Sequence, residues 1–347
     1  MSQPKSANLS NTDYPKSIQR DLSPFQNARR GKSIWQLCNT LIPYVSLWII
    51  SARALSYSIW LALPALILAG GFTIRTFILF HDCGHQSFFR SRRANDFWGR
   101  ITGVLTFTPY HYWHASHARH HATSGNLDKR GFGDVWMMTV DEYMESSVSL
   151  RLKYRLYRHP VVMFIFGPLF LLLVSHRLVR AGSTTRERNS VWLTNIAVLA
   201  IAAALVFLLG WESYLIIQFG SLFLALVGGL WLFYVQHQFE GVYWERDDDW
   251  DFVSASLDGG SFYKLPRVLA WFTGNIGYHH VHHLNARIPN YNLPLCHRDT
   301  PGLQKIRPVK FFGSFKSLRF RLWDEHHRRM VGFGHVKSRR TDSSVAN

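Results

Sequence analysis

Residues 213–239 read SYLIIQFGSLFLALVGGLWLFYVQHQF, without a single Asp, Glu, Lys or Arg. About 20 consecutive apolar residues are enough to carry a helix across the hydrocarbon core of a bilayer. A buried helix of a water-soluble protein rarely stays uncharged over such a length, because part of its surface meets water. The stretch therefore predicts a membrane-spanning helix, and with it a membrane protein.

Further uncharged runs lie on the N-terminal side of this stretch. They cover residues 33–52, 54–74, 159–176 and 189–211. At least four of the five runs are long enough to span a bilayer as helices.

The distribution of basic residues predicts how these helices are oriented. The short connections around Arg53 and around Glu212 carry no excess of Lys or Arg, whereas the N-terminus, the segment after Phe80 and the C-terminal tail are rich in both. Because cytoplasmic loops carry the excess of positive charge, we expect the two short connections on the outer side. The first two helices then form one hairpin and the last two, near 191–210 and 214–236, form a second.

The remaining apolar stretch, 161–174, does not fit this scheme as a crossing. It contains Gly167 and Pro168 at its centre, and the loop that follows is rich in Arg, which keeps that loop in the cytoplasm. We interpret it as re-entrant or interfacial, with a fifth crossing as the alternative, and we also expect 101–110 to be interfacial. The predicted fold is an all-α membrane protein with four transmembrane helices in two hairpins, interfacial or re-entrant helices, and a cytoplasmic helical cap.

Histidines gather in three clusters that this topology brings to one side of the membrane. The clusters are His81 and His85; His117, His120 and His121; and His279, His282 and His283. On a helix, positions i, i+3 and i+4 lie on one face, so each cluster is expected to aim its imidazoles at one point. Three such faces meeting in the cap predict a metal site.

The ligand type narrows the choice of metal only partly. Imidazole ligation suits iron, copper, zinc or nickel. Eight imidazoles are too many for one tetrahedral zinc, so two metals are the economical count. A carboxylate-bridged di-iron site needs Glu-x-x-His pairs, and the sequence has none. His237, alone at the end of the last long apolar run, is either a further ligand or an interfacial side chain satisfied by water.

Other classes of protein fit the sequence less well. The net charge of +17 is compatible with nucleic-acid binding, but the basic residues flank apolar spans, where they favour contact with anionic lipid. A metal transporter needs polar ligands in the middle of its spans, and these spans have none at their centres. By composition, the chain divides into a disordered cytoplasmic tail at 1–32, a membrane domain at 33–298 and a basic cytoplasmic segment at 299–347.

The histidine clusters and their flanks resemble the integral-membrane fatty acid desaturases, nearest to the bacterial and plant acyl-lipid branch. The matching strings are HDCGHQSFF at 81–89, SHARHHATSGNLD at 116–128 and GNIGYHHVHHLNARIPNYN at 274–292, and the resemblance covers roughly 33–298. In that family an additional His follows the last transmembrane helix, and His237 occupies this position. One departure is Trp113-His114, where the family commonly has Trp-Arg.

The resemblance implies a centre of two non-haem iron ions, with O2 as co-substrate. The implied ligands are His81, His85, His117, His120, His121, His237, His279, His282 and His283. The implied reaction is removal of two hydrogens from adjacent methylenes of a long acyl chain, carried by a membrane lipid or an acyl thioester. Related membrane hydroxylases, epoxygenases and carotenoid oxygenases use the same histidine frame and are the alternative.

The resemblance also implies partners and a location. No flavin, nicotinamide or iron–sulfur motif is present in the sequence, so an external donor of the ferredoxin or cytochrome b5 type is expected. The expected location is a bacterial inner membrane, with the site facing the cytoplasm. Near the clusters, Asp82 either orients an imidazole or caps a helix, and Asn275 is a candidate for a water-mediated contact to a metal. Aromatic candidates to line an acyl tunnel are Phe88, Phe89, Trp98, Tyr110, Trp113, Trp271, Phe272 and Tyr278.

Overall fold

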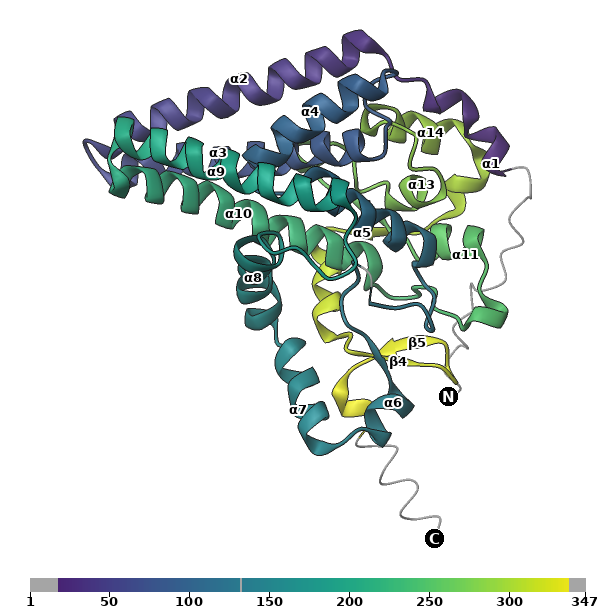
Figure 1. Ribbon diagram of the computed structural model, residues 1–347. Helices are drawn as coiled ribbons and strands as arrows, with labels where there is room; N and C mark the ends of the chain where they lie inside the picture. Colours follow the sequence, from purple (N-terminus) through teal and green to yellow (C-terminus); the bar gives the residue numbers. More distant parts are fainter. Residues whose placement is uncertain (1–17, 132, 337–347) are drawn as a thin grey trace.

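The longest elements of the computed structural model, which describes residues 18–131 and 133–336, are four helices (Figure 1). They are α2 (Arg30–Leu55), α3 (Ile59–Gly84), α9 (Thr185–Leu209) and α10 (Trp211–His237). Each is long and apolar enough to cross a membrane. They coincide with the four predicted spans, so the prediction of an all-α membrane protein with four transmembrane helices is confirmed.

The long helices form the two predicted hairpins. Residues 56–58 connect α2 to α3, and the Ser58 hydroxyl accepts a hydrogen bond from the backbone N–H of Trp60 to begin α3. Gly210 alone separates α9 from α10, with a φ of 79°. That angle lies in the left-handed region, which glycine adopts without steric cost. Both turns lie within a few residues of the connections expected around Arg53 and Glu212.

Helix α3 lies at the centre of the bundle and packs against both α2 and α10. Its Gly70 marks a very close approach to α10. A Cβ atom at this position would lie 2.8 Å from the Cβ of Leu224 and 3.2 Å from the carbonyl oxygen of Ser221. The hydrogen side chain of Gly70 therefore sets the separation of two helices whose far ends carry His81 and His237.

A bent helical segment lies between the hairpins. It consists of α7 (Val148–Tyr157), the π-helix η2 (Val162–Phe166), α8 (Gly167–Phe170) and the π-helix η3 (Leu171–Ser175). Its two halves meet at 65°. By length and composition, the described residues contain four spans, or five if this bent pair is one span. The re-entrant or interfacial placement of 161–174 stays a prediction.

Short helices and loops form a layer at one end of the long helices, which we call the cap (Figure 1). The cap helices that matter for the site are α5 (Tyr110–Thr123), α11 (Phe252–Leu257), α13 (His279–Leu284) and α14 (Leu293–Asp299). Helix α4 (Arg92–Leu105) packs against α3 and α9, and α12 (Arg267–Phe272) precedes the third histidine cluster. Leu257, Val281, Leu284 and Leu293 are fully buried together and join α11, α13 and α14.

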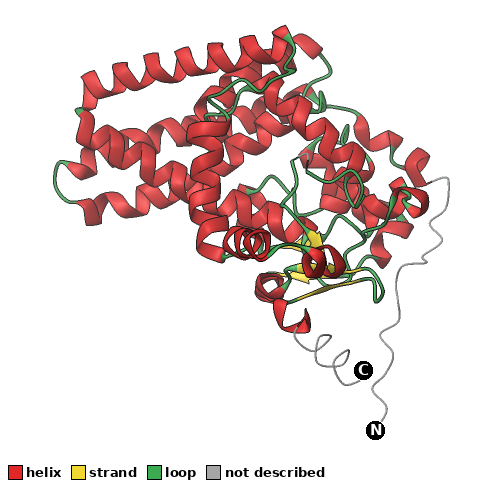
Figure 2. Ribbon diagram, turned by 60° about the horizontal axis from the view of Figure 1, so that its bottom comes forward, coloured by secondary structure: helices red, strands yellow, loops and turns green. Residues whose placement is uncertain are grey.

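Two small sheets, which the sequence did not predict, complete the cap (Figure 2). One contains β1 (Met138–Thr139), β4 (Leu322–Asp324) and β5 (Arg329–Val331); the other pairs β2 (Phe262–Lys264) in parallel with β3 (Pro308–Lys310). Each strand has only two or three residues, too few for the alternating pattern that identifies a strand in a sequence. The sheets attach the basic C-terminal segment to the rest of the cap.

The predicted disorder of 1–32 is wrong for the second half of that range. Residues 18–29 contain α1 (Ile18–Asp21) and the 3-10 helix η1 (Ser23–Gln26), and α2 already begins at Arg30. Ile18 and Leu22 are 2% and 0% exposed, because they pack into the cluster around Leu303 and Cys296. Residues 1–17, the rest of the predicted tail, and residues 337–347, the end of the basic segment, lie outside the described residues.

Replacing Gly70 by Leu is expected to destabilise the protein, because overfilling a packed interface typically costs about 1–3 kcal/mol. The matched control is Gly229→Leu in α10, where an added Cβ would meet nothing within 4 Å. The measurement is the midpoint of thermal unfolding of the full-length protein in detergent. We expect a fall of about 2 °C or more for Gly70→Leu and none for Gly229→Leu. Equal midpoints would contradict the close approach of α3 and α10.

Candidate metal centre

Four elements bring nine histidines together where the long helices meet the cap. His81 lies in the last turn of α3, and His85 is its C-cap. The second cluster lies in the second half of α5, His237 is the last residue of α10, and the third cluster forms most of α13. These nine are the residues that the sequence and its resemblance pointed to, and they fall into two separate groups.

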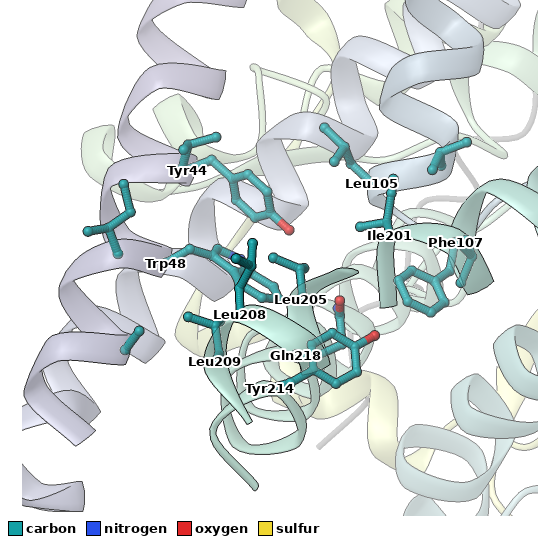
Figure 3. Close-up of a pocket in the computed structure, with 15 residues that line it drawn as sticks. Tyr44, Trp48, Leu105, Phe107, Ile201, Leu205, Leu208, Leu209, Tyr214 and Gln218 are labelled. Carbon is teal, nitrogen blue, oxygen red and sulfur yellow. The ribbon is translucent and has the colours of Figure 1, made fainter. Parts of the chain in front are cut away.

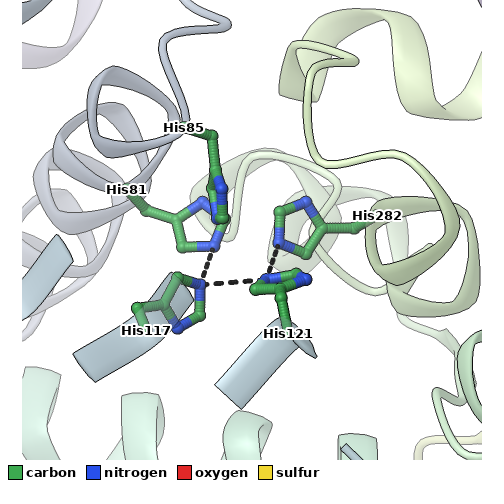
Figure 4. A group of neighbouring side chains, drawn as sticks. All are labelled: His81, His85, His117, His121 and His282. Carbon is green, nitrogen blue, oxygen red and sulfur yellow. Dashed lines mark hydrogen bonds between the residues drawn. The ribbon is translucent and has the colours of Figure 1, made fainter. Parts of the chain in front are cut away.

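The first group contains five imidazoles whose ring nitrogens converge (Figure 4). Its members are His81, His85, His117, His121 and His282. The Nε2 atoms of His81 and His117 are 3.1 Å apart, and so are those of His117 and His121. The Nε2 of His282 lies 3.0 Å from that of His121. One nitrogen from each ring lies within 4.8 Å of all the others.

The second group contains four imidazoles, all buried. Its members are His120, His237, His279 and His283. The Nε2 of His237 lies 3.1 Å from that of His120 and 2.9 Å from that of His279. The ring of His283 lies within 5.1 Å, centre to centre, of the three others.

The contacts within these groups cannot all be hydrogen bonds. An imidazole Nε2 carries either one hydrogen or one lone pair. The Nε2 of His117 nevertheless has two Nε2 neighbours, and the same is true of His121 and His237. No assignment of protons satisfies both contacts at such an atom. A cation accepts all the lone pairs at once, so each donor set fits a metal ion.

Burial favours the neutral form of several of these side chains. Removal from water, together with the neighbouring imidazoles, lowers the pKa of six of them well below the usual value of histidine. The six are His85, His117, His121, His279, His282 and His283. Neutral imidazole is the form that binds a metal.

The division of the ligands corrects one expectation from the sequence. We expected each cluster to aim at a single point, but α5 and α13 each contribute to both groups. In α5, His117 and His121 point to the first group and His120 to the second. In α13, His279 and His283 point to the second group and His282 to the first. Two residues four positions apart point in nearly the same direction from a helix. The remaining histidine of each cluster, at position i+3, is rotated about the helix axis by about 60° or more from both, which is enough to face a second point.

Two carboxylates hold imidazoles of these groups through the opposite ring nitrogen. Asp82 Oδ1 lies 3.3 Å from the Nδ1 of His81, so Asp82 does orient an imidazole, as one of its two expected roles. Asp134 Oδ1 lies 2.6 Å from the Nδ1 of His120. Such a contact fixes the proton on Nδ1 and leaves the Nε2 lone pair for a metal. Sequence reasoning missed Asp134, because it lies in a loop outside all three clusters.

Asp82 is itself held by a polar chain that reaches α2. Its Oδ2 accepts hydrogen bonds from the backbone N–H and the side-chain amide of Asn290, at 2.7 and 2.8 Å. The amide of Gln36 exchanges two hydrogen bonds with that of Asn290, at 2.9 and 3.1 Å. All three side chains are buried. This network could not be predicted from the sequence, because residues 36, 82 and 290 are far apart in the chain and no local pattern links them.

One aromatic candidate contacts the first group directly. The Trp113 ring stacks on His117 with centroids 4.3 Å apart, and it meets the edge of His81 at 5.7 Å. Phe80 packs behind it at 4.8 Å. Tyr110 turns away and donates its hydroxyl to the carbonyl of Cys83. The other candidates are Phe88, Phe89, Trp98, Trp271, Phe272 and Tyr278, and no described ring contact joins them to the nine histidines.

Several histidines outside the two groups are also enclosed. His280 is fully buried and its Nε2 lies 3.0 Å from the Nδ1 of His297, away from both groups. His297 is therefore partly enclosed by the cap, and His176 is buried as well. His111 contacts Arg100 at 3.3 Å.

Comparison with known proteins agrees with this geometry. A family model described as fatty acid desaturase matches residues 58–311. A fatty acid desaturase of Bacillus subtilis (strain 168) is 47% identical over 323 residues, which cover 93% of this chain and 92% of that protein. An sn-1 oleoyl-lipid 12-desaturase of Synechocystis sp. is 31% identical, covering 70% of this chain and 69% of its own. An sn-1 acyl-lipid omega-3 desaturase (ferredoxin) of Synechocystis sp. is 29% identical over 62% of this chain and 61% of its own.

Replacing Asp134 by Asn is expected to weaken metal binding by about 10–100-fold, because His120 loses the carboxylate that fixes its proton. Titration of the metal-free protein with Co²⁺, followed by its visible absorption, measures this. The control is Asp248→Asn, which removes an exposed carboxylate far from the imidazoles in the sequence and outside both groups. Identical Co²⁺ affinities in the two variants would contradict the orienting role of Asp134.

Proposed function

Because the chain belongs to the fatty acid desaturase family, we propose that it introduces a double bond into the acyl chain of a membrane lipid. The observation that carries this proposal is the convergence of nine imidazoles, in groups of five and four, at one end of four apolar helices. The family match and the acyl-lipid desaturases among the relatives support an enzyme that acts on lipid acyl chains.

We propose that the two groups each hold one iron ion and that O2 is the co-substrate. The ligands are His81, His85, His117, His121 and His282 for one ion, and His120, His237, His279 and His283 for the other. An iron pair supplies the oxidising power that removal of hydrogen from an unactivated methylene requires, which no acid or base side chain offers. The all-imidazole donor sets are compatible with iron, and the resemblance to the desaturases supports iron among the metals that imidazole binds.

The protein's own residues contribute orientation and a dry surface. Asp82 and Asp134 hold His81 and His120 by their Nδ1 atoms, so that each Nε2 faces inward. Trp113 and Phe80 cover the membrane side of the first group with aromatic carbon. A methylene placed there meets the ligands without intervening water, which limits side reactions of an activated oxidant.

An apolar cavity between the long helices supports an acyl substrate (Figure 3). It has a volume of about 330 Å³ and lies among α2, α9, α10 and the residues that end α4. Of the lining side chains, only Tyr44, Trp48, Tyr214 and Gln218 carry polar atoms. Gly103, beside the cavity residue Val104, packs closely on Phe80, which in turn contacts Trp113. The cavity suits a hydrocarbon chain far better than a polar metabolite.

The site is proposed to face the cytoplasm of a bacterium, across its inner membrane. Exposed Arg92 and Arg93 lie at the cap end of the bundle, and Arg30 and Lys32 begin α2 there, in agreement with the positive-inside rule. An external carrier supplies the electrons, of the ferredoxin or cytochrome b5 type. The name of one relative includes ferredoxin, which supports the first. The basic surface of the cap suits an acidic carrier.

Replacing His120 or His283 by Ala is expected to abolish the formation of new double bonds while leaving membrane insertion intact, because each change removes one ligand from the group of four. The control is His326→Ala, since His326 is exposed and belongs to neither group. Mass spectrometry of total fatty acids from a host that expresses each variant measures the product.

The same measurement separates the reaction from its alternatives. Loss of two hydrogens from the acyl chain is the expected outcome for the unchanged protein and for His326→Ala. Gain of one oxygen would instead identify a hydroxylase or an epoxygenase. Unchanged double-bond formation in both His120→Ala and His283→Ala would contradict the proposed ligand set.

A further inference from the structure

A second cavity, polar and of about 300 Å³, opens between α2, α3 and α12. Its walls include Trp35, Gln36, Asn39, Arg75, Arg267 and Trp271. Two of these side chains are cationic and none is acidic. The first cavity, by contrast, is lined almost wholly by carbon.

Arg75 is the unusual member of this cavity, because it is only 3% exposed inside a membrane-spanning helix. Its Nε donates to the hydroxyl of Thr40 at 3.0 Å, and a terminal N–H donates to the carbonyl of Trp271. The guanidinium also lies 4.0 Å from the centre of the Trp271 ring. These contacts hold the side chain but bring no negative charge.

Neither arginine of the cavity has an acidic partner within the part of the chain that the structure describes. Among the ion pairs of those residues, none includes Arg75 or Arg267. A buried charge without a counter-ion is costly, so such groups are normally paired. Arg75 is such a buried charge, and because the exposed Arg267 lies on the wall of the same open cavity, the pair calls for an anion from outside the chain.

The cavity lies at the level of lipid headgroups. Arg75 precedes His81 by six residues on α3, or about 9 Å along the helix axis, so it lies close to the end of the span. Trp35 and Trp271 at the rim are 67% and 39% exposed. Exposed tryptophans of membrane proteins gather at the interface between hydrocarbon and water, where the phosphates of the lipids lie.

We propose that this cavity binds the phosphate group of a membrane glycerophospholipid, and that this lipid is the substrate. The inference rests on the proposed desaturase function and names the class of lipid. A phosphate offers several acceptor oxygens, which suit the forked donors of Arg75 and Arg267 and the amide of Asn39. Free phosphate shares this chemistry, but only a lipid brings an acyl chain to the neighbouring metal centre.

The wall of the cavity is tied to the metal centre by side-chain contacts. Gln36 lines the cavity and bonds to Asn290, which bonds to Asp82, which contacts His81. Every member of this chain is buried. The position of a bound phosphate is thereby fixed relative to the first group of ligands, as a reaction at a chosen methylene requires.

Lipid binding tests the proposal without turnover. Full-length protein in detergent is titrated with phosphatidylglycerol, and native mass spectrometry counts the bound lipid in the absence of reductant. Arg267→Gln and Arg75→Gln are expected to weaken binding about tenfold or more, since each removes a charge-assisted contact. Arg93→Gln is the matched control, because it removes an exposed arginine outside the cavity. Arg267 is exposed, so its variant folds even if Arg75→Gln does not.

Three outcomes would overturn the assignment. The first is equal retention of phosphatidylglycerol by Arg267→Gln and Arg93→Gln. The second is that Arg267→Gln weakens the binding of monogalactosyldiacylglycerol, which has no phosphate, as much as it weakens the binding of phosphatidylglycerol. The third is displacement of the lipid by glycerol 3-phosphate or inorganic phosphate at similar concentration, which would make free phosphate the ligand.

Kinetics then tie the cavity to the reaction. With phosphatidylglycerol as substrate, Arg267→Gln is expected to raise the KM about tenfold and to change kcat less than about twofold, because the phosphate contact is made before and during the chemical step alike. An unchanged KM would overturn the substrate role. Failure of the desaturase proposal itself would be distinct, since the unchanged protein would then produce no double bond from any lipid.

Discussion

The rest of the structure depends on one local conflict between neighbouring histidines. Their Nε2 atoms lie about 3 Å apart, and these contacts outnumber the protons and lone pairs that could satisfy them. In water these rings would separate, and in an empty apolar core they would leave unpaired nitrogens. A cation resolves both costs. The bundle and the cap bring the nine histidines together, and a bound metal ion would add its binding free energy to the stability of that arrangement.

Helix α3 carries much of that task. It contributes the close contact at Gly70 that sets the distance to α10, the buried Arg75, and the first two imidazoles at its end. Along the helix, the small Gly70 lies where the helices touch, Arg75 follows nearer the end of the span, and the two histidines come last. One helix would thus fix the relative depth of the proposed lipid and metal sites.

The sequence predicted the parts of this protein that leave a local pattern. Uncharged runs gave all four long helices, and helical spacing together with family resemblance gave all nine histidines, His237 included. The rest depends on residues far apart in the chain. Asp134, Asn290 and Gln36 hold the site from a loop, a short 3-10 helix and another span, and nothing around any of them in the sequence marks the role. The helical structure of residues 18–29 was not predicted for the same reason, because it depends on the packing of Ile18 and Leu22 against the distant Leu303.

Charge connects the two inferred sites. The two groups consist of imidazoles alone, so a pair of metal cations bound there would be compensated only indirectly, by Asp82 and Asp134 through the far side of two rings. The cap end of the bundle also carries Arg75 and Arg267, which have no acidic partner among the described residues, and the whole chain has a net charge of +17. This concentration of positive charge is energetically unfavourable unless anions bind nearby. A lipid phosphate from the membrane side and an acidic electron carrier from the aqueous side are anions of the right kind, and each would bring one of the reactants that the centre needs.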